Sequence, residues 1–147
     1  MLAAVAVVLV ACGDKKADTS GDTTLTAVTP PASTTTGTTH EVQMVQEGEN
    51  FKYLPEELTI KAGDIVVFKS VSGGLHNVQF YPDSIPPGAQ AVLDAAIPNR
   101  QGPVSSELLD AGQQVSISFA GAPAGEYKYF CMPHLAMGMN AKINVTM

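Results

Sequence analysis

Near the end of the chain stands Cys131-Met132-Pro133-His134-Leu135-Ala136-Met137-Gly138-Met139, which gathers a thiol, an imidazole and thioethers in one short stretch. A second imidazole comes from far upstream, where the chain reads His76-Asn77. Two His and one Cys, with a weakly bound Met, are the ligands of a blue-copper electron-transfer site. The soft sulfur ligands favour copper, and imidazole suits both of its oxidation states. The sequence therefore predicts a copper centre, and the rest of the chain fits a carrier for it.

The thiol is expected at the end of a strand. Tyr127, Tyr129 and Cys131 stand at alternate positions, and such positions share one face of a strand. The thiol should therefore point into the core at the end of the domain. Pro and Gly residues after it predict a tight loop that turns His134 and a Met back toward the sulfur. The only other His expected inside the domain is His76.

Seven short runs between residues 41 and 147 have the alternation and the β-branched or aromatic content of strands, with Gly and Pro turns between them. They are residues 41–46, 57–61, 65–71, 76–81, 113–120, 126–131 and 141–146. This pattern predicts an all-β sandwich or barrel. Residues 83–110 differ, because Pro86-Pro87-Gly88 and the Ala-rich residues 89–96 predict a long loop with one short helix.

Composition limits the choice of function. The chain has 147 residues, 45% of them hydrophobic, and a formal net charge of −6. An acidic chain is a poor partner for nucleic acid, whose phosphates need a basic face. The two cysteines, Cys12 and Cys131, are not expected to form a disulfide, because Cys12 lies in an export segment. An unpaired Cys in an exported protein calls for an explanation as a reactive thiol or a metal ligand.

The N-terminal part reads as a lipoprotein signal followed by a tether. Residues 1–11 are apolar but too short to span a bilayer, and Leu9-Val10-Ala11-Cys12 resembles the bacterial lipobox. That resemblance implies cleavage before Cys12, lipid on Cys12, and an exported protein anchored to a membrane and facing the periplasm or the cell exterior. The basic residues that usually precede such a run are missing, and a plain signal peptide with an incidental Cys is the alternative.

Residues 12–40 complete this segment as a disordered tether rich in Thr and Ser. His40 lies at its junction with the domain, residues 41–147, and is expected to be solvated.

Residues 51–147 resemble the plastocyanin and pseudoazurin branch of the cupredoxins. The matching pieces are residues 55–63 and 64–69, His76-Asn77-Val78, Gly125-Glu126-Tyr127, Cys131-x-Pro133-His134 and Gly138-Met139. The resemblance implies a Greek-key β-sandwich of two sheets with one type 1 copper ion near one end. It also implies that His76, Cys131 and His134 are the equatorial ligands.

The axial ligand has two candidates by this resemblance. Some cupredoxin loops place the Met six residues after the Cys, which gives Met137, whereas plastocyanins and pseudoazurins place it eight residues after, which gives Met139. The Gly before Met139 favours Met139, and Met132 and Met137 are then expected at the surface. The residue after the first His, Asn77, is expected to donate its N–H to the thiolate and to brace the ligand loop.

The resemblance further implies how electrons leave the site. The edge of His134 should reach the surface through an apolar docking patch that includes Leu75, Pro133, Leu135 and Met137. A second route is hypothesised at Phe130, which matches a surface aromatic next to Cys131 in plastocyanins, and a packing role in its β-strand is the alternative. The implied partners are redox proteins such as cytochromes or membrane electron-transport complexes, which meet a monomeric carrier.

Other functions fit the residues less well. Structural zinc sites usually use four N, S or O ligands, and a Cys–His hydrolase needs a general base and an oxyanion hole that no motif marks here. Four ligands leave no open position on the metal for a substrate, so one-electron transfer is expected and enzymatic activity is not. The alternative from another class is a periplasmic copper-binding or delivery protein, although no Met-rich tract lies outside the ligand loop.

Overall fold

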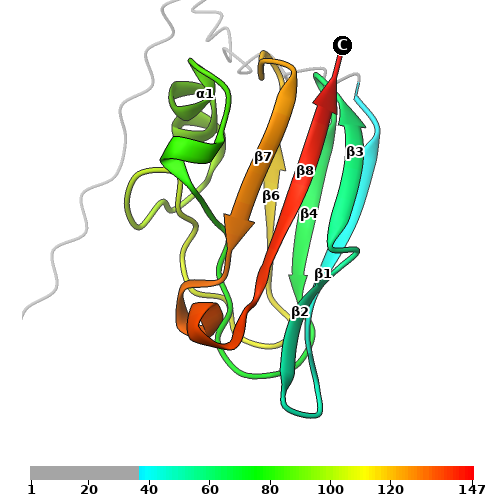
Figure 1. The fold of residues 1–147 in the computed structure, drawn as a ribbon, viewed down its shortest axis with the longest axis vertical. Coiled ribbons are helices and arrows are strands. Elements are labelled where there is room, and N and C mark those ends of the chain that lie inside the picture. Colours follow the sequence, from blue (N-terminus) through cyan, green and yellow to red (C-terminus); the bar gives the residue numbers. More distant parts are fainter. Residues whose placement is uncertain (1–36) are drawn as a thin grey trace, which may run out of the picture. The chain divides into compact units, whose positions relative to one another are not determined.

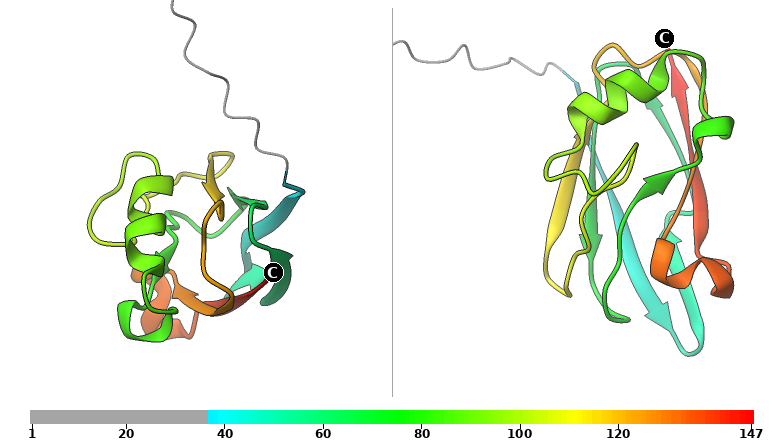
Figure 2. Two further views of the ribbon diagram at one scale, coloured as in Figure 1. Left: turned by 90° about the horizontal axis from the view of Figure 1, so that it is seen from above. Right: turned by 90° about the vertical axis from the view of Figure 1, so that its left-hand side faces the viewer.

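Two four-stranded sheets face each other in the part of the chain that the structure describes, residues 37–147 of a computed structural model (Figures 1 and 2). The strands are β1 (Thr39–Glu47), β2 (Asn50–Leu54), β3 (Glu57–Lys61), β4 (Ile65–Ser70), β5 (Gln79–Phe80), β6 (Gln114–Ser118), β7 (Gly125–Phe130) and β8 (Asn140–Thr146). The expected signal, lipidated Cys12 and most of the tether lie outside the described residues.

The chain crosses repeatedly between the sheets. One sheet has the order β2-β1-β4-β6 and the other β3-β8-β7-β5. Pairing is antiparallel except for β1 with β4 and β3 with β8, which are parallel. This is the all-β sandwich that the sequence predicts.

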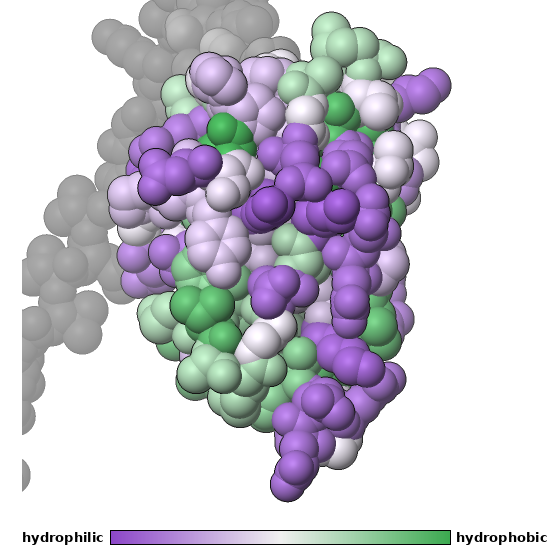
Figure 3. All heavy atoms as spheres, in the orientation of Figure 1, coloured by the Kyte–Doolittle hydropathy of each residue, from purple (hydrophilic) through white to green (hydrophobic). Residues whose placement is uncertain are grey.

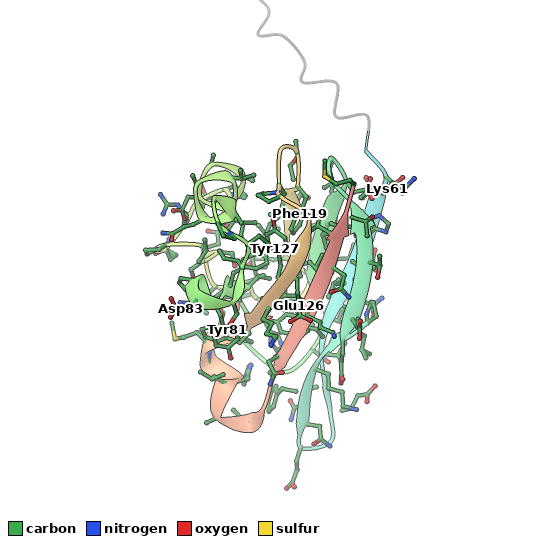
Figure 4. All side chains as sticks on the ribbon, turned by 45° about the horizontal axis from the view of Figure 1, so that its top comes forward. Lys61, Tyr81, Asp83, Phe119, Glu126 and Tyr127 are labelled. Atoms are coloured by element: carbon green, nitrogen blue, oxygen red, sulfur yellow. The ribbon has the colours of Figure 1, made fainter. Side chains whose placement is uncertain are left out.

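Alternation along the strands builds the core. In β4, Val66, Phe68 and Ser70 are buried, and in β6, Val115 and Ile117 are buried. Such β-branched and aromatic side chains suit a pleated surface with one buried face. Figure 4 shows two more core rings, Phe119 and Tyr127, lying between the sheets with their centroids 5.6 Å apart.

The predicted helix is α1 (Ala89–Ala96), which packs on β6 at the end of the sandwich remote from the ligand loop. Ala89 and Leu93 are buried on its inner face, the spacing of an amphipathic helix. Two 3-10 helices, η1 (Pro82–Ser84) and η2 (Met132–Met137), complete the elements of this region. No helix among residues 37–147 is long and apolar enough to cross a membrane.

Two expectations about strands need correction. β2 was not among the predicted runs, although Gly48 at a positive φ and the alternation of Phe51 and Tyr53 mark a hairpin strand. The run at residues 76–81 is a strand only at Gln79–Phe80. In its first half only His76 pairs, through an isolated bridge to Leu109. No strand forms there, because the N–H of Val78 donates to the side chain of Ser106.

The start of β1 also differs from expectation. β1 begins at Thr39, so His40 belongs to a strand and is half-buried. Its Nε2 lies 2.9 Å from Oδ2 of Asp64. His40 is therefore packed against the turn between β3 and β4, where a solvated residue was expected.

Candidate metal centre

Three potential ligands converge at one end of the sandwich. Nδ1 of His76 lies 3.6 Å from Sγ of Cys131, and Nδ1 of His134 lies 3.4 Å from the same sulfur. The potential ligand atoms of the three residues all lie within 4.8 Å of one another. All three side chains are buried, so the donors face a site shielded from water.

The ring of His76 is held in one orientation by a hydrogen bond at the nitrogen that does not face Cys131. Its Nε2 lies 2.7 Å from the carbonyl oxygen of Ser72. Because a carbonyl only accepts, Nε2 carries the hydrogen and Nδ1 offers its lone pair toward Cys131. Burial lowers the pKa of His76, and the bond to Ser72 opposes that fall. The ring is therefore neutral at pH 7 and ready to bind a metal.

His134 is held by stacking. It lies in η2, and its ring is 3.8 Å from that of Phe51, with 11° between the planes. Burial lowers its pKa, and the nearby His76 lowers it further. Phe51 comes from β2, so the hairpin that the sequence did not predict supplies a wall of the site. The hairpin could have been predicted from Gly48 followed by aromatic residues at alternate positions, Phe51 and Tyr53.

Cys131 stands directly after β7, with Tyr127 and Tyr129 on the same inward face, and all three are 0% exposed. Burial raises the pKa of its thiol, and the backbone N–H groups of Asn77 and His134 oppose that rise. Metal binding must therefore release the thiol proton.

Asn77 connects the two segments that carry the ligands. Its backbone N–H favours the thiolate form of Cys131, and its Oδ1 accepts a 2.7 Å hydrogen bond from the N–H of Met132. Its Nδ2 lies 3.3 Å from Oγ of Ser105. Ser105 belongs to the long loop at residues 83–110, and no pattern in that segment predicts a contact with the site.

The ligand loop is closed by its own backbone. The N–H of Cys131 donates to the carbonyl of Met139, and the N–H of Met139 donates to that of His134. Met139 is 0% exposed, whereas Met132 and Met137 are 57% and 50% exposed. Of the three thioethers in the loop, Met139 is thus the one on the inside of the domain.

Exposed apolar side chains surround His134, whose own exposure is only 8%. Leu75, Leu135 and Met137 are 43%, 42% and 50% exposed, and Pro133 is exposed as well. Figure 3 shows hydrophobic residues gathered where Figure 1 draws η2. We call Leu75, Pro133, Leu135 and Met137 the apolar patch.

The expectation for Phe130 is wrong. Phe130 is only 8% exposed, because the ring of Tyr81 covers it at a centroid distance of 4.4 Å. Phe130 itself offers a partner little surface. Tyr81 is only partly buried, so it takes the surface position in this region.

The donors suit copper. A thiolate and two neutral imidazoles that converge in a water-poor site, with a thioether buried nearby, form a soft set that favours copper over harder cations. Both imidazoles present Nδ1 to the same sulfur, so one ion can contact all three residues without rearrangement of the fold.

Comparison with known proteins agrees with this geometry. Residues 40–146 match the family described as copper binding proteins, plastocyanin/azurin family. The plastocyanin of Nostoc punctiforme is 33% identical over 118 residues, which cover 80% of this chain and 78% of that protein. The chloroplastic plastocyanin of Silene latifolia subsp. alba is 31% identical over 106 residues, 71% of this chain and 59% of that one.

Solved structures give the same result. Oxidised plastocyanin from Dryopteris crassirhizoma superimposes with a TM-score of 0.58 and 26% identity, covering 73% of this chain and 100% of the other. Pseudoazurin from Methylobacterium extorquens AM1 gives 0.54 and 26%, covering 73% and 74%. The chain belongs to the plastocyanin/azurin family of copper-binding proteins, and its sandwich is the cupredoxin fold.

Proposed function

We propose that this protein carries single electrons between redox proteins, with one copper ion held by His76, Cys131, His134 and, axially, Met139. The observation that carries the proposal is the convergence of two imidazole Nδ1 atoms on one buried thiol. Bound copper supplies a couple that gains and loses one electron. Matches to plastocyanins across most of the domain support the same role.

The chain's own residues limit structural change during transfer. The Ser72 carbonyl fixes the ring of His76, the stacked Phe51 fixes that of His134, and Asn77 ties the two ligand segments together. Ligands that are already in place need little rearrangement when the metal changes charge. With four protein ligands, no position is left for a substrate, which supports a carrier and not an enzyme.

Electrons are proposed to enter and leave through His134, because it is the ligand that the apolar patch surrounds. Transient redox encounters use small interfaces, and an exposed apolar surface suits such contacts. Cytochromes or membrane electron-transport complexes are the proposed partners of a monomeric carrier. A protein that only delivers copper would have to release the metal. Here hydrogen bonds and stacking fix the ligand side chains in place, which favours retention of the metal.

The absorption spectrum of the full chain after loading with Cu(II), beside Cys131→Ser, tests the proposal. We expect an intense red-absorbing band in the wild type, from charge transfer between the thiolate and copper, and no such band in the variant. A colourless wild-type protein would contradict a type 1 centre and leave copper delivery, zinc binding or a buried thiol.

The axial position has its own test. Met139→Leu keeps the volume but removes the sulfur, so the coloured site should remain while its reduction potential rises, because a weak donor to Cu(II) is lost. Met137→Leu is the matched control at an exposed position of the same loop. If Met137→Leu moved the potential and Met139→Leu did not, Met137 would be the axial ligand.

The proposed location is at a membrane, with lipid on Cys12 and the domain on the periplasmic or outer side. The basis is the sequence Leu9-Val10-Ala11-Cys12. Cys12→Ser should move the protein from the membrane fraction to the soluble fraction of fractionated cells. Retention of the variant in the membrane fraction would argue against the lipid anchor.

A further inference from the structure

A buried phenol lies close to the metal centre. Tyr53, from β2, is 0% exposed and packs edge-to-face against Phe68 and Tyr129, at centroid distances of 6.5 Å and 4.8 Å. Its hydroxyl donates a 2.6 Å hydrogen bond to the carbonyl oxygen of Asn77. Both groups are buried, and a buried polar group without a partner is costly, so this bond satisfies two groups at once.

The same bond fixes the peptide that follows Asn77. The Asn77 carbonyl and the Val78 N–H belong to one planar peptide unit, and the Val78 N–H donates to Oγ of Ser106 at 2.9 Å. The peptide is thus held at both of its polar ends. On the other side of Asn77, His76 is bridged to Leu109 through N–O distances of 3.1 and 2.7 Å. Asn77 has little freedom to rotate between these two fixed units.

The orientation of Asn77 matters because its backbone N–H favours the thiolate form of Cys131 and so lowers the pKa of that thiol, while its Oδ1 accepts a 2.7 Å hydrogen bond from the N–H of Met132, the residue after Cys131. Hydrogen bonding to a ligating sulfur is one of the factors that tune the potential of a blue-copper site. An N–H aimed at the thiolate withdraws electron density from the sulfur. Since Cu(II) depends on that density more than Cu(I), a well-aimed N–H favours the reduced state.

We propose that Tyr53 is a positioning residue of the metal centre, whose hydroxyl aims the Asn77 N–H at the Cys131 sulfur and so raises the reduction potential. This proposal rests on the proposed electron-carrier function. It assigns a role to a fully buried residue that is not itself a proposed ligand.

Tyr53→Phe is the test, because it removes the hydroxyl and keeps the ring. In the copper-loaded full chain we expect a lower reduction potential and a shifted thiolate-to-copper band. Loss of such a supporting contact typically changes metal affinity by about 10-fold or more. If Cu(I) affinity falls about tenfold relative to Cu(II), the potential falls by about 59 mV.

The chain offers a matched control in Tyr129→Phe. Tyr129 is also 0% exposed and lies in the same aromatic cluster, and its hydroxyl has no hydrogen-bond partner among the residues that the structure describes. This variant removes a buried hydroxyl without changing Asn77, so the potential should stay at the wild-type value. Equal potentials in Tyr53→Phe and Tyr129→Phe would overturn the proposal.

A second readout separates this proposal from the proposed function. In the metal-free protein, the amide chemical shift of Asn77 should move in Tyr53→Phe and stay in place in Tyr129→Phe, and an unmoved shift in both would overturn the positioning role. A wild-type protein without the copper–thiolate band would instead contradict the proposed function. If Tyr53→Phe does not fold, Ser106→Ala releases the other end of the same peptide, and an unchanged potential there would also overturn the proposal.

Discussion

Gly73 occupies a position where both the backbone and the space around it require glycine. Its φ is +98°, and a Cβ added there would lie 2.7 Å from Cβ of Gln46, 3.1 Å from Cε1 of Phe51 and 3.2 Å from Nε2 of His76. Gly73→Ala should therefore destabilise the domain and move the Phe51 or His76 ring. We expect a loss of about 2–4 kcal/mol in the free energy of unfolding, measured with urea, from backbone strain plus overpacking.

The neighbouring glycine is the control for that prediction. Gly74 has a φ of +88°, but an added Cβ would meet nothing within 4 Å. Gly74→Ala should cost only the strain of a left-handed residue, about 1–2 kcal/mol, and leave the spectrum of the copper-loaded protein unchanged. Equal losses in the two variants, with equal spectra, would show that crowding at Gly73 does not matter.

At the scale of single residues, the sequence predicted which side chains converge better than it predicted the contacts that hold them in place. His76, Cys131 and His134 could be found because few residue types bind copper and each stands in a distinctive local pattern. The hydrogen bond that orients His76 could not be predicted, because its acceptor is the backbone carbonyl of Ser72 and every residue type has such a carbonyl. Tyr53 was missed because its bond to Asn77 depends on how two distant segments pack.

Among the elements, β1 is joined to the turn between β3 and β4 by a single carboxylate. Asp64 accepts hydrogen bonds from the N–H groups of Thr38 and Lys61 at 2.8 and 2.9 Å, and its Oδ2 lies 2.9 Å from Nε2 of His40. The N–H of Lys61 and the ring of His40 are the main causes that lower the pKa of Asp64 from its ordinary value of 3.8. The stability that Asp64 contributes is therefore present above about pH 4 and is lost as the pH falls through the lowered pKa.

Asp64→Asn should reduce the free energy of unfolding at pH 7 by about 1.5–3 kcal/mol, the size of one hydrogen bond to a charged group. The difference from the wild type should shrink below about pH 4, where the wild-type carboxylate begins to be protonated. Asp110→Asn removes the same charge at an exposed carboxylate that makes no hydrogen bond or ion pair within residues 37–147. A constant difference from pH 7 to pH 3, or an equal effect in both variants, would contradict this role.

Elements with strong periodicity were predictable, and short ones were not. The run at residues 57–61 matches β3, and the Ala-rich segment matches α1. The failure at residues 76–81 has a physical cause: Asn77 and Val78 direct their polar groups to Tyr53, Ser106 and the ligand loop, so they do not pair with a strand. Strand propensity alone cannot show that such partners exist.

For the whole molecule, the central question is whether charge or apolar contact governs encounters with partners. The net charge is −6, yet much of the charge is compensated locally, as where Lys142 lies 3.4 Å from Glu57 and 3.3 Å from Glu126. Leu135→Asp places a charge in the apolar patch and should slow electron transfer to a basic cytochrome about tenfold, equivalent to about 1.4 kcal/mol of docking energy. The reduction potential should not change.

Ala120→Asp adds the same charge at an exposed position at the opposite end of the domain. Stopped-flow rates measured over a range of ionic strength separate the two effects, because long-range steering is screened by salt and local contact is not. Equal rates for the two variants at high salt would show that the apolar patch plays no part in docking.

The backbone bonds that close the ligand loop on itself have an evolutionary consequence. Cys131 and Met139 pair with each other, and His134 pairs with both, so residues 131–139 hold much of their shape through their own backbone. Insertions, deletions or substitutions within this stretch can alter the metal's surroundings while the sandwich is inherited intact. Exchange of this one short loop can therefore change the redox partners or the potential while both sheets keep their sequence.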